Sequence, residues 1–267
     1  MKKWLHILLL LLPMLSCVGQ KDDPIEDPGT EDPGTEEPGG ADAGKDFFRR
    51  SLVLDFTGTW CVNCPKMETA IAETMEARPG RVVPVSVHCM AVDPMYAKPL
   101  SDNLVAQFGV KAYPSAVVDL DAESLISQSS AELLKSHIDR LLEARGAAPG
   151  IRIESTLEGE NYTVKVEMKA VRDGDYTLAV LLLEDGIVEA QTGGTTDHVH
   201  NNVLRSWTGS EPLTGLKEGD TAAFECRGTA SGKVRLAALV LRNGLVDNVV
   251  TCAVGASAEY QYEEENE

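Results

Sequence analysis

Residues 51–64 have the sequence SLVLDFTGTWCVNC, in which a short apolar run leads into two cysteines spaced as Cys-x-x-Cys. The apolar run of residues 51–56 predicts a buried strand, and the helical spacing of apolar side chains over residues 65–78 predicts a helix. A cysteine pair between a strand and a helix is a candidate redox site, because the helix N-terminus stabilises a thiolate. Position makes Cys61 the nucleophile and Cys64 the cysteine that resolves a mixed disulfide.

Strands and helices alternate along the chain on both sides of this motif. The same patterns predict strands at 51–56, 82–87 and 115–120, and helices at 65–78, 100–108 and 131–142. This order predicts an α/β domain over residues 47–146. The strands at 51–56 and 82–87 are expected to run parallel, so that the residues after each of them meet at one edge of the sheet.

The second half of the chain has a different pattern. Residues 150–257 alternate apolar and polar side chains over about seven short segments, separated by turn signals such as Asp173-Gly174. This pattern predicts an all-β, immunoglobulin-like sandwich domain. Residues 258–267 form an acidic tail that is expected to be frayed.

Two segments of the first half resemble the thioredoxin family. Residues 54–61 (LDFTGTWC) are similar to its active-site strand, and residues 108–115 (FGVKAYPS) are similar to its cis-proline loop. The resemblance implies a thioredoxin-like fold for residues 47–146. The expected fold class is therefore an α/β thioredoxin-like domain followed by an all-β, immunoglobulin-like sandwich domain.

The same resemblance implies roles for four residues around the cysteines. Asp55 matches a buried acid that moves the proton of the second cysteine, and Pro114 matches a cis proline that packs against the disulfide. Trp60 and Tyr113 would bind the substrate together with Pro114. The alternative for Asp55 is an ordinary residue at a strand end, close to solvent.

Other thiols and imidazoles leave alternatives open. Cys61, Cys64, His88 and Cys89 have the donor atoms of a zinc site, although a proline stacked over the pair would block a metal ion. Cys89 is either a third redox thiol or a plain buried cysteine, which is the more frequent role of a free cysteine.

In the second half, Cys226 and Cys252 either form a disulfide or are two buried free thiols. His198 and His200 form a His-x-His pair that could chelate a metal ion, but a structural loop is the more common outcome. We expect no metal and no cofactor.

The N-terminus predicts export and lipid anchoring. Residues 1–16 have a basic start and a short apolar run, as in a signal peptide, and the run is too short to cross a bilayer. Residues 14–17 (MLSC) resemble a bacterial lipobox, in which Cys17 would carry the lipid. The alternative is an ordinary secretory signal. Residues 17–46 are rich in Pro, Gly and acidic side chains and are expected to form an extended tether. Within it, residues 20–23 (QKDD) resemble an export signal of surface lipoproteins, which favours a surface-exposed outer-membrane location.

Charge and one further motif limit the possible functions. The net charge of −18 argues against nucleic acid or anionic lipid as a partner. Residues 197–205 (DHVHNNVLR), after a thioredoxin-like half, resemble the outer-membrane-protein-twenty-eight-related family, which implies an exported, membrane-anchored protein. Two hypotheses follow. The protein exchanges disulfides with the thiols of exported proteins, or it is a surface binding or adhesion module for an extracellular ligand, in which the cysteine pair is a structural clip.

Overall fold

A computed structural model describes residues 45–264, so the expected signal peptide, Cys17 and most of the expected tether lie outside the described residues. The helices are α1 (Cys64–Ala77), α2 (Leu100–Phe108) and α3 (Ala131–Arg145), with a short 3-10 helix at Ala122–Ser124. The strands of the first half are β1 (Ser51–Thr57), β2 (Val82–His88) and β3 (Ser115–Val118). The later strands are β4 (Gly150–Glu158), β5 (Asn161–Lys169), β6 (Gly174–Asp185), β7 (Ile187–Glu189), β8 (His198–His200), β9 (Val203–Leu216), β10 (Thr221–Thr229), β11 (Lys233–Arg242), β12 (Leu245–Ala253) and β13 (Ser257–Ala258).

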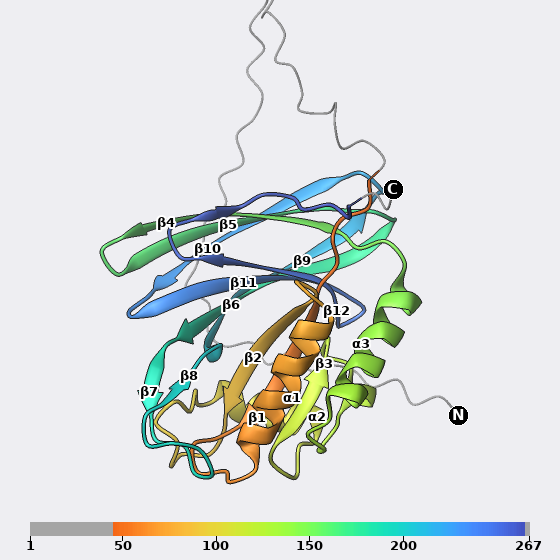
Figure 1. Ribbon diagram of the computed structural model, residues 1–267. Helices are drawn as coiled ribbons and strands as arrows, with labels where there is room; N and C mark the ends of the chain where they lie inside the picture. The colour runs from red at the N-terminus through yellow and green to blue at the C-terminus, as the bar shows by residue number, and fades with distance from the viewer. Residues whose placement is uncertain (1–44, 265–267) are drawn as a thin grey trace, which may run out of the picture. The chain divides into compact units, whose positions relative to one another are not determined.

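Strands from both halves of the chain form one seven-stranded sheet, in the order β12-β11-β6-β9-β2-β1-β3 (Figure 1). The two halves join where β9 pairs with β2 in parallel at Val203 and Ser86, and the Ser86 amide donates to the Asn202 carbonyl oxygen over 2.8 Å. The expected parallel pairing of β1 with β2 is confirmed.

The predicted fold class, an α/β thioredoxin-like domain followed by a separate immunoglobulin-like sandwich domain, is therefore wrong. In the described residues, strands are the predominant regular structure, and there are only three short α-helices and several sheets. β6, β9, β11 and β12 extend the sheet of β1–β3 instead of closing a two-sheet sandwich of their own. Alternation along a strand shows which side chains share a face, but it does not identify the neighbouring strand.

Three hydrophobic cores lie on the faces of this sheet. Leu52, Leu54 and Phe56 of β1 face a core that also contains side chains of α2, β6 and β11. Val53, on the other face of β1, packs with α1 and α3. The third core lies between the sheet and a second, four-stranded sheet, β10-β5-β4-β13, so this part of the protein is sandwich-like.

Charged side chains link the early part of the described residues to their end. Arg49, which is 6% exposed, donates to the carboxylate of Asp247 on β12. The Glu263 carboxylate accepts two hydrogen bonds from Arg81, so the expectation of a frayed tail is wrong at this residue.

Candidate functional site: the Cys61–Cys64 disulfide

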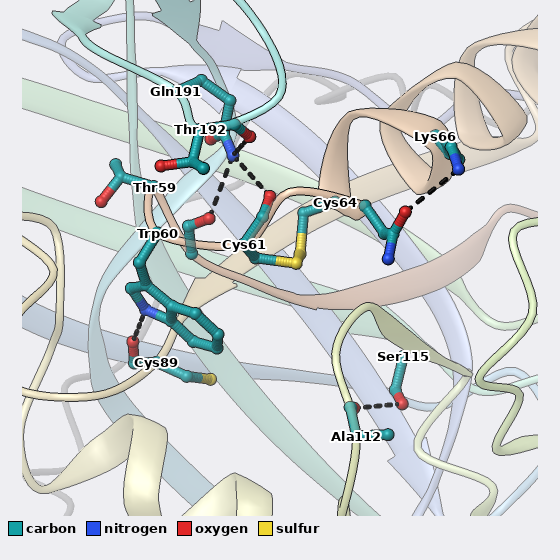
Figure 2. Close-up of a disulfide and its surroundings, with 12 residues drawn as sticks. Thr59, Trp60, Cys61, Cys64, Lys66, Cys89, Ala112, Ser115, Gln191 and Thr192 are labelled. Atoms are coloured by element: carbon teal, nitrogen blue, oxygen red, sulfur yellow. Dashed lines mark hydrogen bonds between the residues drawn. A yellow bond between two sulfur atoms is a disulfide. The ribbon is translucent and has the colours of Figure 1, made fainter.

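The two cysteines lie in the loop that joins β1 to α1. Cys61 and Cys64 form a disulfide, and α1 begins at Cys64 with Pro65 in its first turn (Figure 2). This arrangement follows from the sequence, because the apolar run ends at Thr57 and proline is favoured at the start of a helix. Cys61 is 5% exposed and Cys64 is 2% exposed, so a partner thiol has little access to either cysteine in this conformation.

Asp55 is a buried carboxyl group on the face of β1 that is covered by α1. Side chains alternate along a strand, so Asp55 shares the face of Val53, which packs against α1. Asp55 is 5% exposed, and in the part of the chain that the structure describes its Oδ1 atom has no hydrogen-bond partner. Burial, with a smaller contribution from Glu68, raises the pKa of Asp55 to about 8. Asp55 is thus buried rather than close to solvent, and near neutral pH its carboxyl group is protonated. Its predicted role in proton transfer stays a prediction.

Trp60 and Tyr113 come together beside the disulfide. The indole Nε1 of Trp60 donates to the carbonyl oxygen of Cys89 over 2.9 Å, and the Trp60 and Tyr113 rings meet edge to face with centroids 5.2 Å apart. The peptide bond between Tyr113 and Pro114 is cis, as predicted. In Figure 2 the neighbouring Ala112 and Ser115 lie across from the disulfide. The role of Trp60, Tyr113 and Pro114 in substrate binding stays a prediction.

Cys89 lies close to the site but is a buried thiol. It is 1% exposed, its sulfur donates to the Val87 carbonyl oxygen, and burial raises its pKa to about 12. These features favour the plain buried cysteine over the third redox thiol. The zinc alternative conflicts with the structure, because both Cys61 and Cys64 sulfurs are engaged in the disulfide. Within residues 45–264, no group of three or more His, Cys, Asp and Glu side chains is arranged to hold a metal ion.

Cys226 and Cys252 are free thiols, so the disulfide considered for them is not formed. Burial raises the pKa of both thiols, to about 11 for Cys226. Cys252 belongs to the core between the two sheets, and Cys226 packs against it.

A contact that the sequence did not predict comes from the second half of the chain. We call residues 187–200 the arm; it consists of β7, β8 and the connecting loop. In that loop, the Gln191 side-chain nitrogen donates to the carbonyl oxygens of Gly58 (3.2 Å) and Cys61 (3.0 Å), as Figure 2 shows. The Thr192 amide donates to the Thr59 carbonyl oxygen over 2.7 Å. The only signal in the sequence is a polar, glycine-containing loop at 191–195, and nothing in it points to the cysteines.

The arm also brings histidines from distant parts of the sequence together. The Nε2 atom of His198 lies 3.1 Å from a carboxylate oxygen of Glu68 on α1. The His200 ring lies between those of His198 and His88, with centroid distances of 4.6 and 5.3 Å. His88, at the end of β2, contacts the Asp93 carboxylate through Nδ1 over 3.0 Å. His198 and His200, on β8, therefore contact the body of the protein.

Comparisons with known proteins support the fold and give no function. No family model matches this chain, and no curated protein sequence matches it. Among solved structures, HBP35 of Porphyromonas gingivalis is similar with a TM-score of 0.66 and 16% identity, over 79% of this chain and 76% of that one. Protein AGR_C_4864 from Agrobacterium tumefaciens is similar with a TM-score of 0.51 and 15% identity, over 80% of this chain and 97% of that one. At these identities the likeness concerns the fold alone.

Proposed function

We propose that this chain is an exported thiol–disulfide exchange protein in which Cys61 and Cys64 react with thiols of other exported proteins. One observation carries the proposal: a Cys-x-x-Cys disulfide at the start of α1 follows β1, the strand that carries Asp55, a buried carboxyl group whose pKa burial raises to about 8. A structural clip has no need for a buried carboxyl group on the preceding strand that is protonated near neutral pH.

The reaction begins with a thiolate of a partner that carries two thiols. This thiolate attacks the Cys61 sulfur, a mixed disulfide forms, and the Cys61–Cys64 bond breaks. Cys64 leaves as a thiolate and takes a proton from the Asp55 carboxyl group. The second partner thiolate then attacks the partner sulfur of the mixed disulfide and releases Cys61 as a thiolate. The partner ends with a disulfide, and the cysteine pair is reduced by two electrons; the reverse sequence reduces a partner.

The test is the reduction potential of the Cys61–Cys64 pair, measured by equilibration with glutathione buffers. An exchange protein should have a potential above about −300 mV, whereas structural disulfides typically lie below that value. The Asp55→Asn variant should transfer disulfides more slowly and keep a similar fold, because it removes the proton donor but preserves the side-chain shape. A potential below about −300 mV would refute the exchange function.

A second candidate function is a surface binding module in which the disulfide is a clip. The burial of both cysteines and the packing of the arm against their loop favour this candidate. In that case the potential lies in the structural range. Replacing both Cys61 and Cys64 with serine would then lower stability and leave binding of the extracellular ligand intact.

The proposal includes the location of the protein. Its support is the N-terminal sequence: an apolar run, MLSC at residues 14–17 and an acidic Pro/Gly-rich segment. Across residues 45–264, every helix is too short or too polar to cross a bilayer. Lipid on Cys17 would anchor the protein to the outer membrane, and the segment at residues 197–205 supports a place in the outer-membrane-protein-twenty-eight-related family.

Replacement of Cys17 with serine tests the anchor. The variant should leave the membrane fraction, and a variant that stays membrane-bound would contradict lipid anchoring. Added protease should cleave the protein on intact cells if it faces outward. Cleavage that needs cell lysis would show that the protein faces inward.

A further inference from the structure

The arm has two different faces. On β8, His198 and His200 point toward the body of the protein and contact Glu68 and His88. Val199, which lies between them, is 47% exposed. Its cross-strand partner on β7, Val188, is 64% exposed. Alternation along a strand places one set of side chains against the body and the other toward solvent. The face of β8 that packs against the body therefore carries polar side chains, and the apolar side chains face solvent.

The loop of the arm holds the backbone of the cysteine loop. Gln191 is 7% exposed, and its side-chain nitrogen also donates to the Thr192 carbonyl oxygen over 3.1 Å. The loop also packs tightly at Gly193, where a side-chain carbon would lie 2.3 Å from the carbonyl oxygen of Val62. Motion of the cysteine loop therefore requires that these contacts break.

His200 is the buried centre of the docked face. It is 6% exposed, and its Nε2 atom has no hydrogen-bond partner among the described residues. The titratable groups around it are His198 on its own strand, His88 at the end of β2, Asp93 in the loop after β2, and Glu68 on α1, which pairs with His198. Within residues 45–264, each neighbouring histidine has a carboxylate partner and His200 has none.

We propose that the arm is a brace on the cysteine loop, that it docks only while His200 is neutral, and that acidification releases it and exposes Cys61 to partners. This inference rests on the proposed exchange function in one respect, because the arm would regulate access of partner thiols to the same Cys61–Cys64 pair.

The sign of the effect follows from the environment of His200. Burial, then the neighbouring His88 and His198, lowers the pKa of His200 to about 4, while the backbone of Glu189 acts in the opposite direction. In a released arm the ring returns to an ordinary pKa of about 6.5. The docking constant of the arm is therefore at its maximum above about pH 6.5 and falls as the pH decreases toward 4. Between pH 7.5 and 5 the docking constant should fall by at most about 30-fold.

One contact across the docked face acts against this release. His198 of the arm pairs with the Glu68 carboxylate on α1, whereas His88 and Asp93 both belong to the body. An imidazolium–carboxylate pair is stronger than the neutral one, so the observed change should be smaller than 30-fold. His200 decides the direction because a charge on it is buried without a carboxylate partner.

The test measures access to the disulfide and needs no partner protein. The full-length oxidised protein is reduced with tris(2-carboxyethyl)phosphine at pH 7.5 and pH 5. Each rate is divided by that of hydroxyethyl disulfide at the same pH, which removes the pH dependence of the reductant. The normalised rate of the wild-type protein should rise about tenfold at pH 5, since a braced loop keeps Cys61 buried.

Three variants make the test specific. His200→Leu cannot titrate, so its normalised rate should change less than twofold. His137→Leu, which replaces a histidine on α3, should behave like the wild type. Gln191→Glu places a carboxylate against the carbonyl oxygens of Gly58 and Cys61, so it should be reduced about tenfold faster than the wild type already at pH 7.5.

The results separate the two proposals. A normalised wild-type rate that does not change with pH, or a pH dependence that persists in His200→Leu, would overturn the release mechanism. If His200→Leu does not fold, Gln191→Glu decides: a rate equal to that of the wild type at pH 7.5 would overturn the brace. The rate of reduction by the phosphine reports only on access to the disulfide. If the variants show that the arm acts as a brace but the reduction potential lies in the structural range, the exchange function is refuted and the brace is supported.

Discussion

Gly193 offers a direct test of how tightly the arm packs on the cysteine loop. Gly193 has φ +80°, and a β-carbon there would lie 2.3 Å from the Val62 carbonyl oxygen, a backbone atom that cannot rotate away. Gly186, just before the arm, has φ +74° and nothing within 4 Å of its β-carbon position. The two glycines therefore have similar φ angles and differ in the space around them, so Gly186→Ala is a matched control for Gly193→Ala.

The structure sets different costs for the two substitutions. Each alanine costs about 1–2 kcal/mol of stability, because an L-residue is strained in the left-handed region. Gly193→Ala must also displace the loop and break its hydrogen bonds to Gly58, Thr59 and Cys61. At about 1 kcal/mol for each bond, the additional cost is about 3 kcal/mol.

Urea denaturation and amide hydrogen exchange measure these effects. Gly193→Ala should lose about 3 kcal/mol more stability than Gly186→Ala, or should fold with the arm released and exchange the Thr192 amide rapidly. The Thr192 amide should stay protected in Gly186→Ala, since its bond to Thr59 is intact there. Equal stability losses together with a protected Thr192 amide in Gly193→Ala would refute the tight packing.

Three further predictions concern the cysteine pair and the buried charges. Asp55→Asn removes a carboxyl group whose raised pKa makes folding of the wild type less favourable as pH rises from about 4 to about 8. The stability of the variant relative to the wild type, measured in urea, should therefore rise by up to about 5 kcal/mol across that window. A stability difference that does not change with pH would contradict the raised pKa. After reduction near neutral pH, iodoacetamide should modify Cys61 before Cys64, because Cys61 lies just before the N-terminus of α1 and Cys64 lies inside the helix. Peptide mass spectrometry that finds Cys64 modified first would reverse the two roles. Asp247→Asn removes the charged partner of Arg49, which is 6% exposed, and should cost about 3–5 kcal/mol in urea denaturation; a loss below about 1 kcal/mol would show that this pair contributes little.

The local structure around the cysteines could be predicted from the sequence. The apolar run at residues 51–56 and the helical spacing at residues 65–78 correspond to β1 and α1, each within a residue or two. The cis bond before Pro114 also agrees with the resemblance of its segment. These features depend on neighbours in the sequence, which is why short patterns were enough to predict them.

The tertiary structure alone decided how the two halves join and what covers the cysteine loop. Alternation in the second half matches the burial pattern of β5, but side chains on both faces of β6 and β11 are buried, and alternation carried no information about β9 pairing with β2. The burial of Gln191 and His200 likewise depends on residues more than a hundred positions away in the sequence, at Cys61 and His88. A strand edge accepts any partner with a free ladder of amides and carbonyls, and a polar side chain gives no local sign that it will be buried. Both outcomes are set by the packing of the whole chain.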